Sequence, residues 1–141
     1  MKLYFLRRLS FLPFLIIAGL FPTVANGLSA QDIPEPAQCY FTAVAASDLS
    51  ALEQCFQPDA VIIDVNRKIS GIEAIRNWAE KEVIGGRYEI LSIVSQGQNQ
   101  IKILIKFVPP GLWGKLSKGF RAHYTLDFKQ GKIIRMDLQY A

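Results

Sequence analysis

A single acidic residue interrupts an apolar segment near the middle of this 141-residue chain. Asp64 lies in the run AVIIDV, residues 60–65, whose β-branched residues predict a strand. Because side chains alternate across a strand, Asp64 is expected on the same face as Ile62. A carboxylate in an apolar cavity has a raised pKa, since desolvation disfavours its charged form, and it can then abstract a proton next to a carbonyl. The structural alternative is a turn, because an aspartate followed by Asn66 often accepts backbone hydrogen bonds.

The only two cysteines, Cys39 and Cys55, predict one disulfide if the chain enters an oxidising compartment. In the chain-entropy model a loop of this length stabilises the fold by about 3 kcal/mol. The alternative is a pair of buried free thiols that pack as small hydrophobic groups. A structural metal site is disfavoured, because two cysteines and one histidine do not complete a tetrahedral shell.

The only histidine, His123, precedes Tyr124 in a predicted strand. Neighbouring residues of a strand face opposite sides of the sheet. If Tyr124 points into a pocket, His123 lies on the outer face, as a surface or dimer-face residue.

The apolar side chains that could form a pocket wall cannot be separated by pattern from those that form a core. In the predicted strand over residues 100–108, isoleucines alternate with polar residues and lead to Phe107. Residues 109–118, PPGLWGKLSK, form one long connection, which suits a lid, a partner contact or a loop packed on the sheet edge. The candidate ligand-binding residues are Trp78, Ile103, Phe107 and Trp113.

The first thirty residues have the pattern of a secretory signal. A basic start is followed by an apolar run over residues 11–21 and by small residues at Ala25, Gly27 and Ala30. The run is shorter than the ~20 residues of a membrane span, which leaves an uncleaved anchor as the alternative. We therefore predict a signal peptide over residues 1–30, cut between residues 25 and 30, and a secreted or periplasmic protein with no stable membrane anchor after cleavage.

The charge balance argues against nucleic acid as the partner. The predicted signal carries three of the 16 lysines and arginines and none of the 12 acids, which leaves a net charge of +1 on residues 31–141. The basic residues are scattered rather than gathered in a stripe, as a nucleic-acid binder would require. No cofactor motif is present.

The predicted secondary-structure elements fall into two groups. Three helices are predicted first. The first spans residues 35–46, and the second is a shorter helix that Asp48 or Ser50 caps, that carries Phe56 and that stops at Pro58. The third begins at a capping box formed by Ser70 and Glu73. A short strand over residues 67–69 precedes the third helix. The remainder alternates with a period of two and predicts four long strands, over residues 88–96, 100–108, 119–129 and 132–140. The fold class is therefore α+β, with three N-terminal helices packed on a cone-shaped, curved antiparallel sheet that leaves a cavity between them.

Three segments carry a resemblance to a known family: YFTAVAASDLSALEQCFQPDAVIIDV, then ISGIEAIRNW, then QGKIIRMDLQY. Together they resemble the SnoaL-like branch of the nuclear transport factor 2-like superfamily over residues 36–140, so residues 31–141 are interpreted as one SnoaL-like domain. The pattern specifies the fold more closely than the chemistry. Members include isomerases, polyketide cyclases and epoxide hydrolases, and many form homodimers.

Ketosteroid isomerases share this fold, and the resemblance implies roles for three residues of this chain. Tyr40 falls where those enzymes keep an oxyanion tyrosine, and Asp64 falls where they keep the general base. Tyr124 replaces their protonated acid. The candidate catalytic residues are therefore Asp64, Tyr40 and Tyr124, with the two tyrosines donating hydrogen bonds to a developing enolate oxygen.

Three functions stay open at this point. The first is a non-enzymatic pocket for a small apolar or amphipathic molecule. The second is an isomerase, cyclase or lyase with Asp64 as base and Tyr40 as oxyanion donor. The third is a dimeric protein-interaction module.

Overall fold

The fold was taken from a computed structural model, which describes residue 28 and residues 32–141, the side chains of residues 112 and 113 excepted. The predicted signal peptide lies outside the described residues apart from residue 28, so it stays a prediction. No helix in the described part of the chain has the length and apolar character to cross a membrane.

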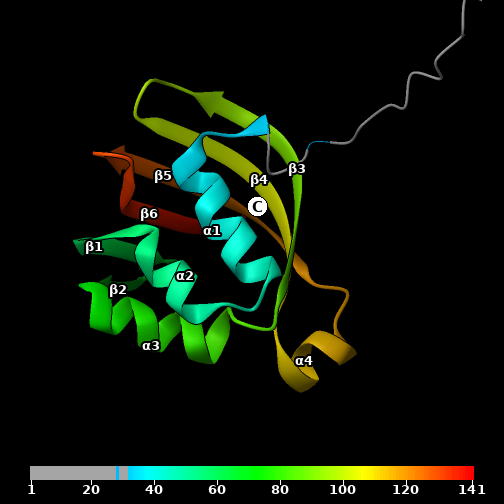
Figure 1. The fold of residues 1–141 in the computed structure, drawn as a ribbon. Helices are drawn as coiled ribbons and strands as arrows, with labels where there is room; N and C mark the ends of the chain where they lie inside the picture. Colours follow the sequence, from blue (N-terminus) through cyan, green and yellow to red (C-terminus); the bar gives the residue numbers. More distant parts are fainter. Residues whose placement is uncertain (1–27, 29–31) are drawn as a thin grey trace, which may run out of the picture.

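The described residues form four helices and six strands (Figure 1). The helices are α1 (Glu35–Ala45), α2 (Leu49–Gln54), α3 (Ile72–Glu82) and α4 (Gly111–Leu116). The strands are β1 (Phe56–Asp64), β2 (Arg67–Ser70), β3 (Arg87–Gln96), β4 (Gln100–Val108), β5 (Phe120–Lys129) and β6 (Lys132–Tyr140). The predicted α+β class and the four long C-terminal strands are confirmed.

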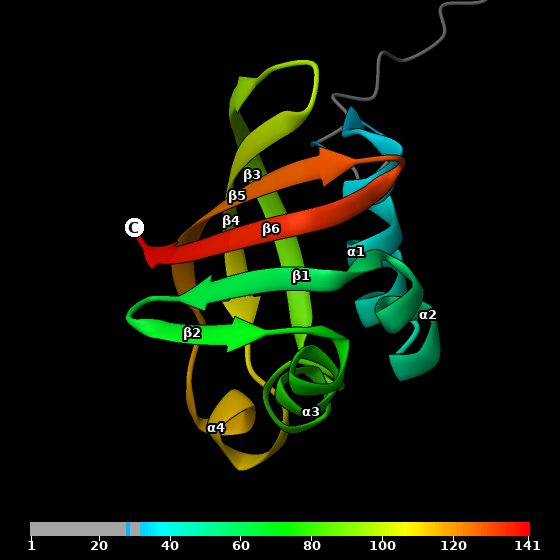
Figure 2. The same ribbon diagram turned by 90° about the vertical axis from the view of Figure 1, so that its left-hand side faces the viewer.

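The six strands form one open sheet in the order β2-β1-β6-β5-β4-β3. The four-strand meander from β3 to β6 is antiparallel, as expected, whereas β1 pairs with β6 in parallel. Figure 2 shows β3 and β4 crossing steeply behind β1 and β2, so the sheet is strongly twisted and curved. Helix α1 packs on β3 and β6, and α3 packs on β1 and β2.

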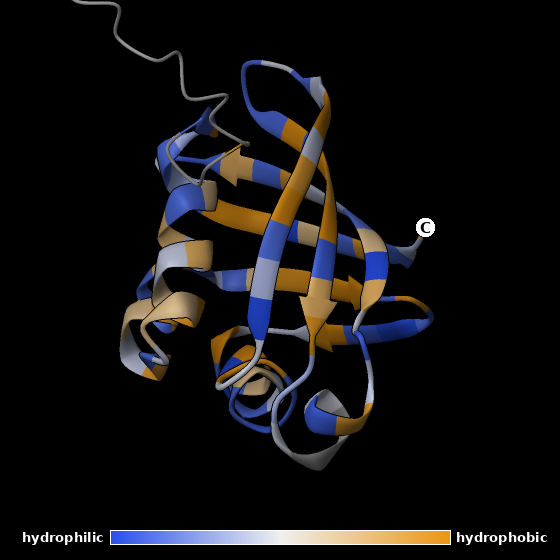
Figure 3. Cartoon of the chain, turned by 90° about the vertical axis from the view of Figure 1, so that its right-hand side faces the viewer, coloured by the Kyte–Doolittle hydropathy of each residue, from blue (hydrophilic) through white to orange (hydrophobic). Residues whose placement is uncertain are grey.

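The core lies between the helices and the inner face of the sheet. Alternating residues of β4, Ile101, Ile103, Ile105 and Phe107, are all buried. Figure 3 shows the same alternation of hydrophobic and hydrophilic residues along the long strands. The inner face therefore supplies the apolar surface whose removal from water stabilises the fold.

The second helix is shorter than the sequence predicted. Asp48 caps it, since its side chain accepts a hydrogen bond from the Ala51 amide at 2.9 Å. The prediction that Phe56 belongs to this helix was wrong: Phe56 opens β1 and pairs with Ile133 of β6. The strand tolerates Pro58, which has no N–H to donate, because the register of β1 on β6 is irregular there.

The predicted capping box at the start of the third helix was also wrong. Ser70 is held in the β2 ladder opposite Val61 and is not available as a cap. Gly71 occupies the cap position instead, at φ 85°, a left-handed conformation that glycine adopts without steric cost. The long connection over residues 109–118 likewise differs from a plain loop, because it contains α4.

Candidate functional site

A cavity of about 370 Å³ opens at the end of the sheet that α3 covers. Its apolar wall comes from α3, the end of β4, the start of β5 and the end of β6: Trp78, Val83, Phe107, Pro109, Pro110, Phe120, Ala122 and Leu138. Its polar lining includes Asp64, Arg67, Lys81, Glu82, Tyr124, Gln139 and Tyr140. The volume falls within the range of about 300–1,000 Å³ that is usual for small-molecule pockets.

The cavity has a buried end and an exposed rim. Tyr124, Ala122 and Phe107 are buried, whereas Lys81 and Tyr140 are exposed. The apolar wall therefore lies inside and the charged groups lie outside, which suits a ligand with an apolar body and one polar end.

Asp64 lines this cavity but is not surrounded by apolar groups, contrary to the expectation from the sequence. It forms an ion pair with Arg67, and it accepts a hydrogen bond from the indole nitrogen of Trp78 at 3.3 Å. Both donors use the same carboxylate oxygen, Oδ2. The β1–β2 turn explains the ion pair, because it places Asp64 and Arg67 opposite each other in the ladder.

Arg67 also joins the hairpin to α3. Its guanidinium donates to both carboxylate oxygens of Glu82, at 2.9 and 2.7 Å. This hydrogen bonding lowers the pKa of Glu82. The three residues thus form a charged rim at one side of the cavity, and their net charge is negative.

Three tyrosine hydroxyls form a hydrogen-bonded chain from the core to the cavity. The Tyr40 and Tyr88 hydroxyl oxygens are 2.9 Å apart, and those of Tyr88 and Tyr124 are 2.8 Å apart. Tyr124 lines the cavity, whereas Tyr40 has no exposed surface and does not line it. Tyr40 is therefore not placed to donate a hydrogen bond directly to a ligand. Tyr124 is the one of the three hydroxyl-bearing residues that lines the cavity.

Burial keeps these hydroxyls protonated. It is the largest cause of the raised pKa of Tyr40, Tyr88 and Tyr124, because a phenolate is poorly solvated in the core. The negative charge of Asp64 raises the pKa of Tyr40 and of Tyr124 further. At neutral pH each of the three tyrosine hydroxyls consequently keeps its proton, so each has one hydrogen bond to donate.

The direction of the chain follows from this proton count. If Tyr124 donated inward, the proton of either Tyr40 or Tyr88 would be left without an acceptor among the three hydroxyls, which costs about 1–3 kcal/mol. If Tyr40 donates to Tyr88 and Tyr88 donates to Tyr124, the spare proton belongs to Tyr124. The buried arrangement therefore favours Tyr124 as a hydrogen-bond donor into the cavity.

The other candidates from the sequence separate into two groups. Trp78 and Phe107 line the cavity with Asp64 and Tyr124, whereas Ile103 is fully buried in the core and does not. The side chain of the remaining ligand-binding candidate, Trp113, lies outside the described residues. His123 lies opposite Leu104 and Gln139 in the ladder and alternates with the buried Ala122 and Tyr124, so it faces outward as predicted.

Sequence reasoning missed several site residues, among them Tyr88 and Arg67. Tyr88 stands at the start of a predicted strand, and nothing in its neighbourhood marks it as the middle of a hydroxyl chain. Arg67 follows Asp64 across a turn of two residues, Val65 and Asn66. That turn was the sequence signal that could have placed Arg67 opposite Asp64. The role of Tyr88 becomes visible only in the tertiary structure.

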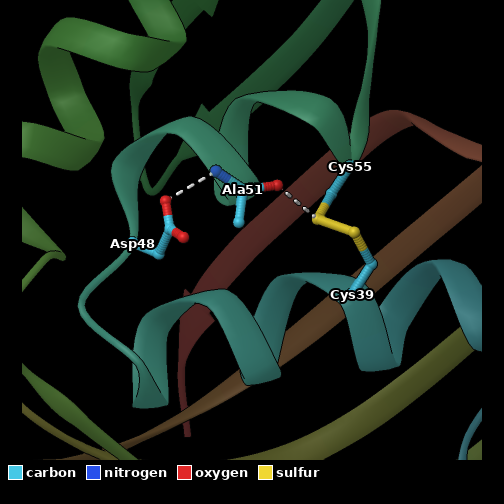
Figure 4. Close-up of a disulfide and its surroundings, with 4 residues drawn as sticks. All are labelled: Cys39, Asp48, Ala51 and Cys55. Carbon is cyan, nitrogen blue, oxygen red and sulfur yellow. Dashed lines mark hydrogen bonds between the residues drawn. A yellow bond between two sulfur atoms is a disulfide. The ribbon is translucent and has the colours of Figure 1, made fainter.

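The predicted disulfide is confirmed between Cys39 of α1 and Cys55 at the end of α2 (Figure 4). The sulfur of Cys55 lies 3.2 Å from the Ala51 carbonyl oxygen, a contact rather than a hydrogen bond, because a disulfide sulfur has no proton. The bridge precedes Tyr40 and Phe56 by one residue each, and these two rings pack edge to face at 6.1 Å. The disulfide therefore fixes the core end of the tyrosine chain.

In the described part of the chain, no three histidine, cysteine, aspartate or glutamate residues are grouped so that they could hold a metal ion.

A family model described as SnoaL-like domain matches residues 37–136. A search of curated proteins returned no match. Similar solved structures include a "putative polyketide cyclase" from Sinorhizobium meliloti, 24% identical, with a TM-score of 0.66 over 79% of this chain and 100% of that one.

Two further structures are similar at lower identity. An NTF2-like protein of unknown function from Cytophaga hutchinsonii is 13% identical, with a TM-score of 0.64 over 84% of this chain and 95% of that one. RV0760c from Mycobacterium tuberculosis, in complex with estradiol-17β-hemisuccinate, is 17% identical, with a TM-score of 0.62 over 75% of this chain and 91% of that one. These likenesses establish the fold.

Proposed function

Because the chain belongs to the SnoaL-like family, whose fold is nuclear transport factor 2-like, we propose that it binds a small amphipathic molecule in the cavity beneath α3. One observation carries the proposal: Tyr124, at one end of the hydrogen-bonded tyrosine chain, lines a largely apolar cavity of about 370 Å³. The steroid bound by RV0760c supports a ligand of this class. Export of the protein and its homodimerisation stay predictions.

The ligand orientation follows from the two ends of the cavity. An apolar ring system would contact Phe107, Phe120 and Leu138, where burial of each apolar Å² contributes about 25 cal/mol. A carbonyl or hydroxyl oxygen at the buried end would accept a hydrogen bond from the Tyr124 hydroxyl. A polar or charged group at the other end would reach the rim and stay hydrated.

Replacement of Tyr124 by phenylalanine is expected to weaken binding of a ketosteroid about 3- to 10-fold, because it removes one hydrogen bond of about 0.5–1.5 kcal/mol. Isothermal titration calorimetry would measure this against a steroid that lacks the ketone, whose affinity should not change. Tyr140→Phe is the matched control, since Tyr140 also lines the cavity but is exposed and takes no part in the chain. Equal losses for both steroids would show that Tyr124 shapes the wall and donates to no ligand.

A second function, proton transfer next to a carbonyl, is favoured by one specific arrangement. Asp64 and Tyr124 line the same cavity, and Asp64 acts electrostatically on the Tyr124 hydroxyl. In such a mechanism Asp64 would take the proton through Oδ1, since Arg67 and Trp78 both donate to Oδ2. Tyr124 would stabilise the enolate oxygen.

Asp64→Asn tests this second function with a β,γ-unsaturated ketosteroid, whose conversion to the conjugated isomer is followed by ultraviolet absorbance. An enzyme of this kind should lose at least about 100-fold in rate, the usual scale for a general base, while still binding the steroid. If wild type and Asp64→Asn convert the ketone at the same rate, Asp64 is no base for this reaction. The binding proposal would then stand without the catalytic one.

A further inference from the structure

The charges of residues 31–141 are divided unevenly along the chain. From residue 90 to residue 126 there are five lysines and arginines and no aspartate or glutamate. The remaining residues after residue 30 carry eight basic and 12 acidic residues, a net charge of −4. The near-neutral total thus conceals a basic segment that comprises β4, α4 and the first part of β5.

The centre of this segment, α4, begins at the cavity. Pro109 and Pro110 line the cavity directly before the helix, and Phe120 lines it directly after the connection. Figures 1 and 2 show α4 at the same end of the sheet as α3, beyond the ends of the strands. A surface that contacts α4 would therefore lie next to the cavity mouth.

The exposed side of α4 combines an apolar residue with cations. Leu116 is 74% exposed, the highest value among the exposed large hydrophobic residues described, and Lys115 and Lys118 beside it are exposed as well. Two other exposed hydrophobic residues, Tyr140 and Val65, line the cavity. Exposed apolar groups next to lysines are the composition of segments that lie in the headgroup region of a membrane.

We propose that Lys115, Leu116 and Lys118, here the α4 tip, dock the protein on an anionic phospholipid surface, with the cavity mouth facing the bilayer. Charge complementarity favours this partner, because the α4 tip carries two lysines and the sequence from residue 90 to residue 126 has no acidic residue. Arg67 pairs with both carboxylates of the cavity rim, Asp64 and Glu82, and Lys81, which lines the same cavity, offsets the remaining negative charge. Docking would let an amphipathic ligand pass between bilayer and cavity, although docking itself does not depend on the proposed ligand binding.

The test is binding to vesicles of phosphatidylglycerol and phosphatidylcholine in equal parts, compared with phosphatidylcholine alone. The protein is expressed as the full chain, and mass spectrometry verifies that all variants carry the same N-terminus. Wild type should bind the mixed vesicles more tightly and lose affinity as salt is raised. Lys115→Glu/Lys118→Glu should weaken this binding at least about 25-fold, since each lysine near such a surface contributes about fivefold.

Two control variants separate a local contact from the total charge and total apolarity. Lys129→Glu/Lys132→Glu makes the same charge change at the β5–β6 turn. This turn is separated from the α4 tip by strands about 30 Å long, a distance greater than the Debye length. The affinity of this variant for the mixed vesicles should change less than about twofold. Leu116→Ser should weaken binding at least about 10-fold, as expected for one inserted leucine. Val94→Ser, which changes another exposed apolar residue in β3, should have no effect.

Three results would overturn the proposal. One is equal binding of wild type to the two kinds of vesicle. Another is an equal loss in the two lysine double variants, which would mean that only the net charge matters. The third is a concentration-dependent dimer in sedimentation velocity that Leu116→Ser dissociates while vesicle binding is absent, which would make a second copy of the chain the occupant of the α4 tip.

Discussion

Replacement of Ala122 by phenylalanine is expected to lower the affinity for a steroid ligand at least about 100-fold, roughly 2.7 kcal/mol, without unfolding the protein. Ala122 lies on β5 with its methyl group on the cavity wall, two residues before Tyr124. A phenyl ring at this position would occupy the space in which the ligand packs. Because the ring enters a hollow, the overpacking cost of about 1–3 kcal/mol that a filled core would impose should not arise.

Calorimetric titration would give the affinity, and thermal unfolding would give the stability of the same preparation. Thr125→Phe is the control, because it also adds a phenyl ring to β5, three residues along the strand and on the outer face. Wild-type affinity in Ala122→Phe would place the ligand elsewhere and contradict the cavity proposal. A fall in unfolding temperature without a change in affinity would show instead that the cavity is filled by the fold in solution.

Loss of the disulfide should lower the stability substantially. The double variant Cys39→Ser/Cys55→Ser removes a bridge between residues 16 apart, which contributes about 3 kcal/mol in the chain-entropy model. For a domain of this size we expect the unfolding temperature to fall by about 10–20 °C. The tyrosine chain should loosen as well, because the bridge fixes the residues next to Tyr40 and Phe56.

Differential scanning calorimetry with and without a reductant would measure this effect. Reductant should lower the unfolding temperature of wild type to that of the double variant and leave the double variant unchanged. An unfolding temperature that is the same for all four samples would mean that the bridge adds nothing to stability. If the double variant were too unstable to purify, reduction of the wild-type protein would still report the difference.

The sequence predicted those features that depend on short-range patterns. The alternation of apolar residues predicted β4 and β6 with their observed bounds, because a strand with one buried face must repeat every two residues. The same parity correctly placed His123 on the outer face. The spacing of Cys39 and Cys55, with the expectation of export, predicted the bridge that the structure contains.

The errors fall where a distant partner decides the local structure. Phe56 fits a helical spacing, but its pairing with Ile133 gives it a place in β1. Ser70 and Glu73 fit a capping box, but Ser70 is engaged in the β2 ladder, and Gly71 takes the cap. In each case, hydrogen bonds to another strand outweigh a local preference of about 1 kcal/mol.

In the candidate site, the sequence likewise marked residues, whereas distant contacts decided how they are arranged. The residue types of Asp64, Tyr40 and Tyr124 were sufficient, with the family resemblance, to mark them as candidates. The tertiary structure decided that Arg67 and Trp78 bind the carboxylate of Asp64, and that Tyr88 connects Tyr40 to Tyr124. Periodicity and covalent chemistry were enough to predict the fold class, the strand faces and the cysteine pair. Which hydroxyl reaches the cavity could be learned only from the folded chain, because it depends on contacts between residues 36 or more positions apart.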